Sequence, residues 1–107
     1  MSAFHDDKLW QEAYVVTLDA LDATSAQTGN DLVDQVRKHV MMVLTVAAQA
    51  VNDRDRKIRD TKLRDAGHII VALRSLLSVL WGQEVFSDEV FEKLDGAYEA
   101  LAAKLPR

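Results

Sequence analysis

The chain contains no cysteine, and this absence removes several kinds of chemistry at once. Disulfides, thiol nucleophiles and cysteine-ligated zinc or iron–sulfur sites all require that residue. Proline occurs once and glycine four times, so few positions are suited to tight β-turns. With 49% hydrophobic and 28% charged residues over a length of 107, the composition favours a single all-helical domain across residues 1–107.

The sequence also lacks a long hydrophobic run. Its longest, Val40 to Val51, is interrupted by Thr45 and Gln49, whereas a membrane-spanning helix needs about 18 or more uninterrupted apolar residues. Residues 1–7 have neither the basic start nor the apolar stretch of a secretory signal. We therefore predict no membrane association and a cytoplasmic location, which the absence of cysteine also fits.

Acidic residues outnumber basic ones, giving a net charge of −4, but the charges are unevenly spread. Residues 1–34 carry seven acidic residues and one lysine, whereas residues 52–65 carry six basic and four acidic residues. Phosphate contacts dominate nucleic-acid affinity, so the overall charge disfavours that function. A local basic band can nevertheless contact phosphates.

Apolar residues recur at steps of three and four in four segments, which is the pattern of amphipathic helices. Asp6 or Asp7 is suited to cap the first helix, Asn30 the second and Ser87 the fourth, and Gly29 is suited to a left-handed helix end. The short first and last connections favour an all-α, antiparallel up-down-up-down four-helix bundle. The predicted helices span residues 8–27, 31–51, 55–81 and 88–104.

The pattern leaves two interpretations open for the connection between the second and third predicted helices. We place a break near Asn52 and Asp53, where the apolar stripe stops. The alternative is one unbroken helix over residues 31–82, because neither glycine nor proline lies between Asn30 and Gly67. Such a helix would be about 78 Å long, which suits only a swapped dimer.

From Val40 onward, the second helix is apolar in nearly every direction. One reading is a central helix with some apolar exposure. The reading we favour is a second buried face supplied by another copy of the chain, because large exposed apolar patches usually mark interfaces. The predicted oligomer interface comprises Met41, Met42, Leu44 and Val46.

The residue patterns contain no recognisable catalytic or metal-binding set. Asp65 and His68 place a carboxylate and an imidazole on one face, but a di-metal bundle needs two such pairs and further inward carboxylates. Glycine-rich phosphate loops and nucleophile motifs are also missing. We predict a non-enzymatic protein with no catalytic residue, metal ligand or cofactor, and keep a small helical enzyme or metal protein as a third alternative.

Six basic residues fall within residues 54–64, and two more lie on the second predicted helix. One interpretation is a phosphate-contacting band for RNA or DNA. The other is a solvated helix face neutralised by the interspersed Asp53, Asp55, Asp60 and Asp65, with no interleaved aromatic residue for base stacking. The candidate nucleic-acid or partner-binding residues are Arg37, Lys38, Arg54, Arg56, Lys57, Arg59, Lys62 and Arg64.

Several of these stretches together resemble the four-helix-bundle family of 23S ribosomal-RNA intervening-sequence proteins, which includes the accessory variability proteins of diversity-generating retroelements. An aromatic residue precedes an acidic spacer and a Trp-Gln pair, and a Leu-x-x-Gln-Val-Arg-Lys stretch opens the second helix. The fourth helix is similar as well. The residues that carry the resemblance are Phe4, Asp6, Trp10, Gln11, Ala13, Leu32, Gln35, Val36, Arg37, Lys38, Ser87, Glu89, Phe91 and Leu94.

The resemblance implies a non-enzymatic bundle that assembles into a ring-like homo-oligomer, commonly a pentamer. For the retroelement relatives it implies binding of a reverse transcriptase and its RNA. The sequence thus predicts a self-associating scaffold that binds RNA and a nucleic-acid enzyme. The alternative is an oligomeric protein-interaction module with no nucleic-acid role.

Overall fold

The computed structural model describes residues 3–107, which form four α-helices and a short 3-10 helix and contain no strand. The helices are η1 (Ala3–Asp6), α1 (Lys8–Thr24), α2 (Asp31–Asn52), α3 (Arg56–Gly82) and α4 (Asp88–Ala102). The predicted all-helical class is therefore confirmed.

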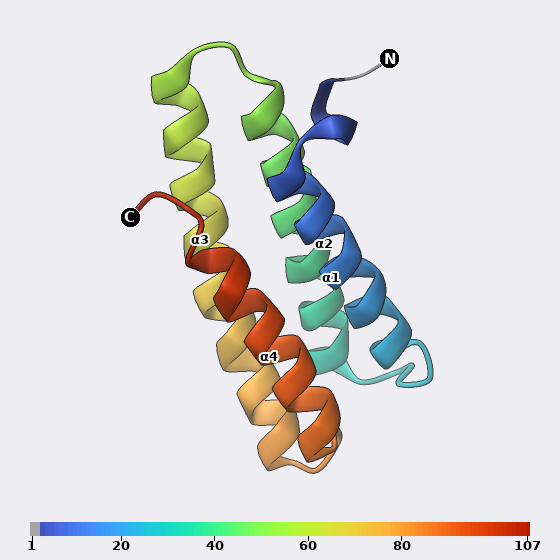
Figure 1. Ribbon diagram of the computed structural model, residues 1–107. Coiled ribbons are helices and arrows are strands. Elements are labelled where there is room, and N and C mark those ends of the chain that lie inside the picture. The colour runs from blue at the N-terminus through green and yellow to red at the C-terminus, as the bar shows by residue number, and fades with distance from the viewer. Residues whose placement is uncertain (1–2) are drawn as a thin grey trace.

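Each helix packs against its neighbours in the chain, and α1 also packs against α4. In Figure 1 the turn between α2 and α3 lies at one end of the molecule, and the turns on either side of it lie at the other. The N-terminal η1 lies at the same end as the α2–α3 turn and contacts α2.

The first helix begins where Asp7 caps it. The Asp7 Oδ1 atom accepts hydrogen bonds from the backbone N–H groups of Leu9 and Trp10 at 2.8 and 3.1 Å. The helix ends at Thr24, three residues earlier than predicted, where the backbone tightens: the Ser25 N–H donates to the Asp22 carbonyl at 3.2 Å and the Gln27 N–H to the Thr24 carbonyl at 3.1 Å. Gly29 has the predicted left-handed conformation, with φ of 81°, but it lies in the connecting turn rather than at the helix end.

The break between the second and third helices lies where it was predicted. The second helix ends at Asn52, and the Asp55 Oδ1 atom caps α3 by accepting from the N–H groups of Lys57 and Ile58 at 2.9 and 3.3 Å. Asp53 folds the intervening turn, since its Oδ1 atom accepts from the Asp55 N–H at 2.9 Å. The alternative of an unbroken helix over residues 31–82 is therefore wrong.

The connection into the last helix uses an unexpected left-handed residue. Gly82 is helical, whereas Glu84 has φ of 62°. The α3 end is closed by the Glu84 N–H bonding to the Trp81 carbonyl at 3.0 Å and the Val85 N–H to the Leu80 carbonyl at 2.9 Å. Ser87 then caps α4 as predicted, accepting from the Val90 N–H at 3.2 Å.

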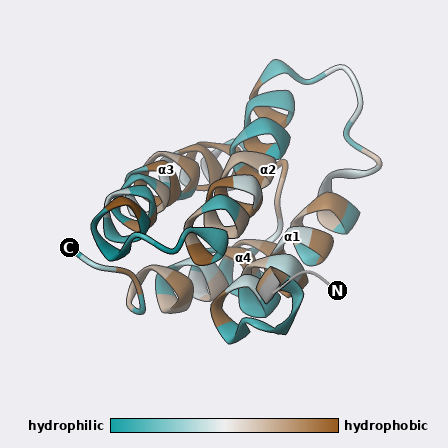
Figure 2. Ribbon diagram, turned by 90° about the horizontal axis from the view of Figure 1, so that it is seen from above, coloured by the Kyte–Doolittle hydropathy of each residue, from teal (hydrophilic) through white to brown (hydrophobic). Residues whose placement is uncertain are grey.

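One continuous core joins all four helices, and Figure 2 shows each helix carrying both hydrophobic and hydrophilic residues. Its largest side chains with essentially no exposure include Tyr98, Ile70, Leu73, Leu77 and Leu80. A paired ionic contact between Arg74 and Asp95, at 2.8 and 3.1 Å, joins α3 to α4. Within residues 3–107, no helix has the length and hydrophobicity needed to cross a membrane.

Candidate interaction surfaces

The eight predicted binding cations do not form one band, because two of them lie near the start of α2 and the other six lie beyond or near its far end. Arg37 and Lys38 lie near the start of α2, beside the α1–α2 turn. The other six lie around the α2–α3 turn. About 21 Å of helix separates Lys38 from Asn52, at about 1.5 Å per residue. The two groups therefore cannot contact the same few phosphates.

Arg37 has a structural role. Its Nη1 atom donates to the Leu21 carbonyl at 3.0 Å and to the Thr24 hydroxyl at 2.7 Å. Both acceptors lie in the last turn of α1, where carbonyl groups lack helical partners. Arg37 is half-buried by these contacts, whereas its neighbour Lys38 is exposed.

Four cations at the α2–α3 turn are exposed and form no ion pair within residues 3–107; we call them the basic turn. They are Arg54, Arg56, Lys57 and Arg59. The remaining two have partners: Lys62 lies 3.6 Å from the Asp53 carboxylate, and the Arg64 Nε atom donates to the Arg107 carbonyl at 2.9 Å. The basic turn thus contains the predicted cations that are available to an external anion at this end.

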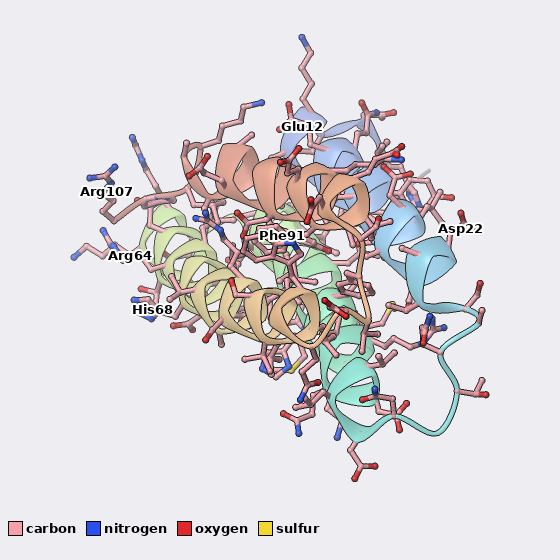
Figure 3. The ribbon with its side chains drawn as sticks, turned by 90° about the horizontal axis from the view of Figure 1, so that it is seen from below. Glu12, Asp22, Arg64, His68, Phe91 and Arg107 are labelled. Carbon is pink, nitrogen blue, oxygen red and sulfur yellow. The ribbon has the colours of Figure 1, made fainter. Side chains whose placement is uncertain are left out.

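The basic turn projects beyond the fourth helix. Leu105 lies against Gly67: a Cβ atom built on this glycine would be 3.8 Å from the Leu105 Cδ1 atom. Two residues further on, the Arg107 carbonyl accepts from Arg64. The chain after α4 therefore reaches only the third turn of α3. Figure 1 shows the first turns of α3 extending past α4, and Figure 3 shows Arg64, His68 and Arg107 on the same side of the molecule.

The opposite end of the molecule is acidic. Residues 19–34, which include the α1–α2 turn, carry four acidic residues and no basic residue. Around the α3–α4 turn, residues 84–92 carry four acidic residues and no basic residue. Arg37 and Lys38 lie at this end too, but most of its charged residues are acidic, whereas the four cations of the basic turn lie at the end where η1 also lies.

An aromatic cluster on η1 and the start of α1 was not predicted as a functional feature. The rings of Phe4 and His5 stack at 4.1 Å, Phe4 meets Trp10 edge-on at 5.2 Å, and Trp10 stacks on Tyr14 at 5.1 Å. His5 and Tyr14 are exposed and the other two are half-buried. Because η1 lies at the α2–α3 end, this cluster is at the same end of the molecule as residues 54–64, which contain no aromatic residue.

The four predicted interface residues on α2 differ in exposure. Met41 and Met42 are 42% and 40% exposed, whereas Leu44 and Val46 are half-buried and pack against the core. The second helix lies against both α1 and α3, so its neighbours cover most of its apolar surface. Only the two methionines leave a large apolar group accessible in the middle of this helix.

The largest set of exposed apolar side chains close together in the sequence belongs to α1. Tyr14, Val15 and Leu18 are 42%, 57% and 48% exposed, and they fall within five residues. Beside them, a groove of about 550 Å³ runs between α1 and α4. Val15 and Val16 line it from α1, and Ala97, Ala100 and Leu101 line it from α4.

Ion pairs cross between the two helices at both ends of this groove. Lys104 donates to the Glu12 carboxylate, and Lys93 lies 3.9 Å from the Asp19 carboxylate. All four side chains are substantially exposed, so these pairs add little to stability. Glu12 and Lys104 also line the groove, and the apolar floor made by Val15, Val16, Ala97, Ala100 and Leu101 stays open.

The described residues contain no group of three or more side chains arranged to hold a metal ion. His39 contacts the Gln35 carbonyl of its own helix at 2.7 Å, and His68 is an exposed residue on α3. Asp65 is also exposed and lies one helical turn before His68. This part of the surface therefore offers a single partial pair of ligands.

Comparison with protein-family models, with curated proteins and with solved structures finds no match to the chain.

Proposed function

We propose that this protein is a non-enzymatic scaffold that associates with itself and binds RNA through the basic turn. Its proposed architecture is an antiparallel, up-down-up-down four-helix bundle. The observation that carries the RNA-binding part is the set of four exposed, unpaired cations at one end, since cations already held in ion pairs are poor ligands for phosphate.

The location of these cations supports the proposal further. They lie in the α2–α3 turn and on the first residues of α3, which extend beyond α4, so a long polymer can approach without colliding with the fourth helix. Exposed His5 and Tyr14 and half-buried Trp10 lie on η1 and α1, at or towards the same end. Aromatic rings next to cations bind single-stranded RNA by stacking on its bases.

Self-association is supported by the exposed apolar surface on α1 and on the middle of α2. Exposed apolar groups that gather on one helix usually mark a contact with another protein. The resemblance to the intervening-sequence and accessory variability proteins adds a ring, commonly a pentamer, and a reverse transcriptase with its RNA as partners. A reverse-transcriptase gene beside the gene for this chain would support that partner.

RNA binding can be tested by reversing two charges of the basic turn. Arg56→Glu with Arg59→Glu should weaken RNA binding and lower the slope of log affinity against log salt by about 1 to 2. A matched control, Lys38→Glu with Lys93→Glu, changes the net charge equally but away from the basic turn. The control should bind RNA as the unaltered chain does, and binding that ignores both salt and the basic-turn changes would exclude the proposal.

A second function is favoured by a different observation. The net charge is −4, and the α1–α4 groove is lined mainly by apolar groups, which together suit an oligomeric protein-interaction module with no nucleic-acid role. In that case, affinity capture at low salt should retain a protein partner and leave RNA in solution. Retention of RNA by the unaltered chain and not by the basic-turn variant would decide for the first function.

A further inference from the structure

The first helix carries a second stripe of residues on the side away from the core. Its core positions include Ala13, Val16 and Ala20. The second stripe, which we call the outer stripe, follows steps of three and four residues, as the contact positions of paired helices do. It comprises Lys8, Gln11, Val15, Leu18 and Asp22, all of which are exposed.

The centre of the outer stripe is apolar and lies beside a groove that can receive side chains. Val15 and Leu18 are 57% and 48% exposed, and Tyr14 adjoins them at 42%. Lys8, Gln11 and Val15 also line the α1–α4 groove. On its far wall, Ala97 and Ala100 are small, so the groove has room for a side chain from another molecule.

The ends of the outer stripe carry opposite charges. Lys8 lies at its start and Asp22 at its end, and neither forms an ion pair within residues 3–107. In Figure 3 Asp22 lies at the outer margin of α1. A parallel pair of these helices would place like charges together at both ends, whereas an antiparallel pair brings opposite charges within reach of each other.

We propose that the occupant of this surface is a second copy of the chain, docked through its own outer stripe with the two α1 helices antiparallel. A two-fold axis that passes between Val15 and Leu18 places Val15 of one copy against Leu18 of the other. It also pairs Gln11 with Asp22 and brings Lys8 within a helical turn of Asp22. The contact matches apolar centre to apolar centre and opposite charge to opposite charge, as a self-complementary two-fold interface requires.

This inference rests on the proposed self-association but assigns it a particular geometry. A two-fold contact closes after two copies, whereas a ring requires two different faces to meet. The native mass therefore separates them. Sedimentation of the unaltered chain should give a particle of twice 12.0 kDa.

The apolar part of the interface is tested with Val15→Glu plus Leu18→Glu in the full chain. Both residues are exposed, so we expect an unchanged helical circular dichroism spectrum and a mass reduced to 12.0 kDa. Val71→Glu plus Val79→Glu is the matched control, because these valines are 68% and 44% exposed on α3. The control should leave the mass unchanged.

The orientation is tested by exchanging the terminal charges. Lys8→Glu and Asp22→Lys should each raise the dissociation constant several-fold, and the double variant should restore it, because each altered residue then meets its altered partner. Single variants that dimerise as well as the unaltered chain would overturn the antiparallel arrangement.

The remaining outcomes assign failure to one proposal or the other. A monomer at every concentration would overturn both the self-association and this interface. An oligomer that survives Val15→Glu plus Leu18→Glu would overturn this interface alone. A particle of five copies would overturn the two-fold pairing and support the ring. A chain that is monomeric alone but binds a different helical protein, with that binding lost in Val15→Glu plus Leu18→Glu, would give this surface to that protein and overturn the proposal.

Discussion

The guanidinium of Arg37 on α2 and the hydroxyl of Thr24 on α1 are joined by a hydrogen bond of 2.7 Å, with the Arg37 Nη1 atom as donor. Thr24 is 2% exposed, and its hydroxyl also donates to the Ala20 carbonyl at 2.8 Å. The same Nη1 atom donates to the Leu21 carbonyl. These contacts tie the end of α1 to the start of α2, so a residue predicted to bind a phosphate holds two helices together.

Replacing this arginine should therefore destabilise the fold. Arg37→Met keeps most of the aliphatic stem but removes the donor, and should lower the free energy of unfolding by about 1–2 kcal/mol. Lys38→Met is the control, because Lys38 is exposed and should change stability by less than about 0.5 kcal/mol. Urea denaturation measures both. An Arg37→Met variant of full stability with weakened RNA binding would contradict this assignment.

The left-handed conformation at Glu84 predicts a stabilising substitution. Non-glycine residues pay about 1–2 kcal/mol in this conformation, and Glu84 has φ of 62°. We expect Glu84→Gly to raise the free energy of unfolding by up to about 1 kcal/mol. Gln83→Gly should lower it, because Gln83 has φ of −85° and gains only unfolded-state flexibility. Thermal melts of the two variants in opposite directions would support this reading, and a shift in the same direction would refute it.

Tyr98 contains a buried hydroxyl without a hydrogen-bond partner in the described residues. Its side chain is 0% exposed, and the nearby Thr17 hydroxyl donates to the Ala13 carbonyl at 2.7 Å instead. An unsatisfied buried polar group costs about 1–3 kcal/mol. Tyr98→Phe should accordingly leave the stability at neutral pH unchanged or raise it by about 1 kcal/mol, and a loss of more than about 1 kcal/mol would show that the hydroxyl has a partner.

The same hydroxyl predicts how stability depends on alkaline pH. Burial raises the pKa of Tyr98 well above its ordinary value of 10.0. The folded state thus favours the neutral phenol, and this contribution is fully present below the pKa of the unfolded chain. As pH rises above about 10, the unfolded chain loses the proton first and the free energy of unfolding falls by up to about 1.4 kcal/mol per pH unit. Tyr98→Phe should show a smaller fall, measured by urea denaturation at pH 9 and above about pH 10.

The cap of the fourth helix gives a local test of stability. Ser87→Ala removes the acceptor for the Val90 N–H and should cost about 1 kcal/mol. Ser78→Ala is the control, because the Ser78 hydroxyl only donates back to the Arg74 carbonyl of its own helix at 2.8 Å. Alanine at that position should be neutral or slightly stabilising. Equal melting temperatures for Ser87→Ala and the unaltered chain would show that Ser87 is not the cap.

The helices could be predicted from the sequence because local signals define them. Apolar residues recur with helical spacing, Asn30, Asp55 and Ser87 cap their helices with their own side chains, and the apolar stripe stops at Asn52. Where competing local bonds decide the end, prediction was less accurate. Tight backbone bonds from the Ser25 and Gln27 N–H groups close α1 early, and the left-handed position falls at Glu84 rather than at Gly82, two residues before it.

The surfaces were harder to predict because they depend on which helices cover which. The middle of α2 was expected to carry the excess apolar surface, but Leu44 and Val46 pack against the core and only Met41 and Met42 are exposed. Val15 and Leu18 are exposed on α1, and only the position of α4 shows that Val15 borders a groove. Similarly, Arg37 and Arg59 look alike in the sequence, although one contacts α1 and the other is exposed beyond the end of α4.

Both the proposed self-association and the α1 interface require that single copies of this chain do not persist alone. Small-angle scattering combined with sedimentation of the unaltered chain tests it directly. A lone copy has a mass of 12.0 kDa and a Cα radius of gyration of 13.9 Å. Self-association predicts a larger mass and radius that fall towards these values on dilution. A particle that keeps both single-copy values at every concentration would contradict it.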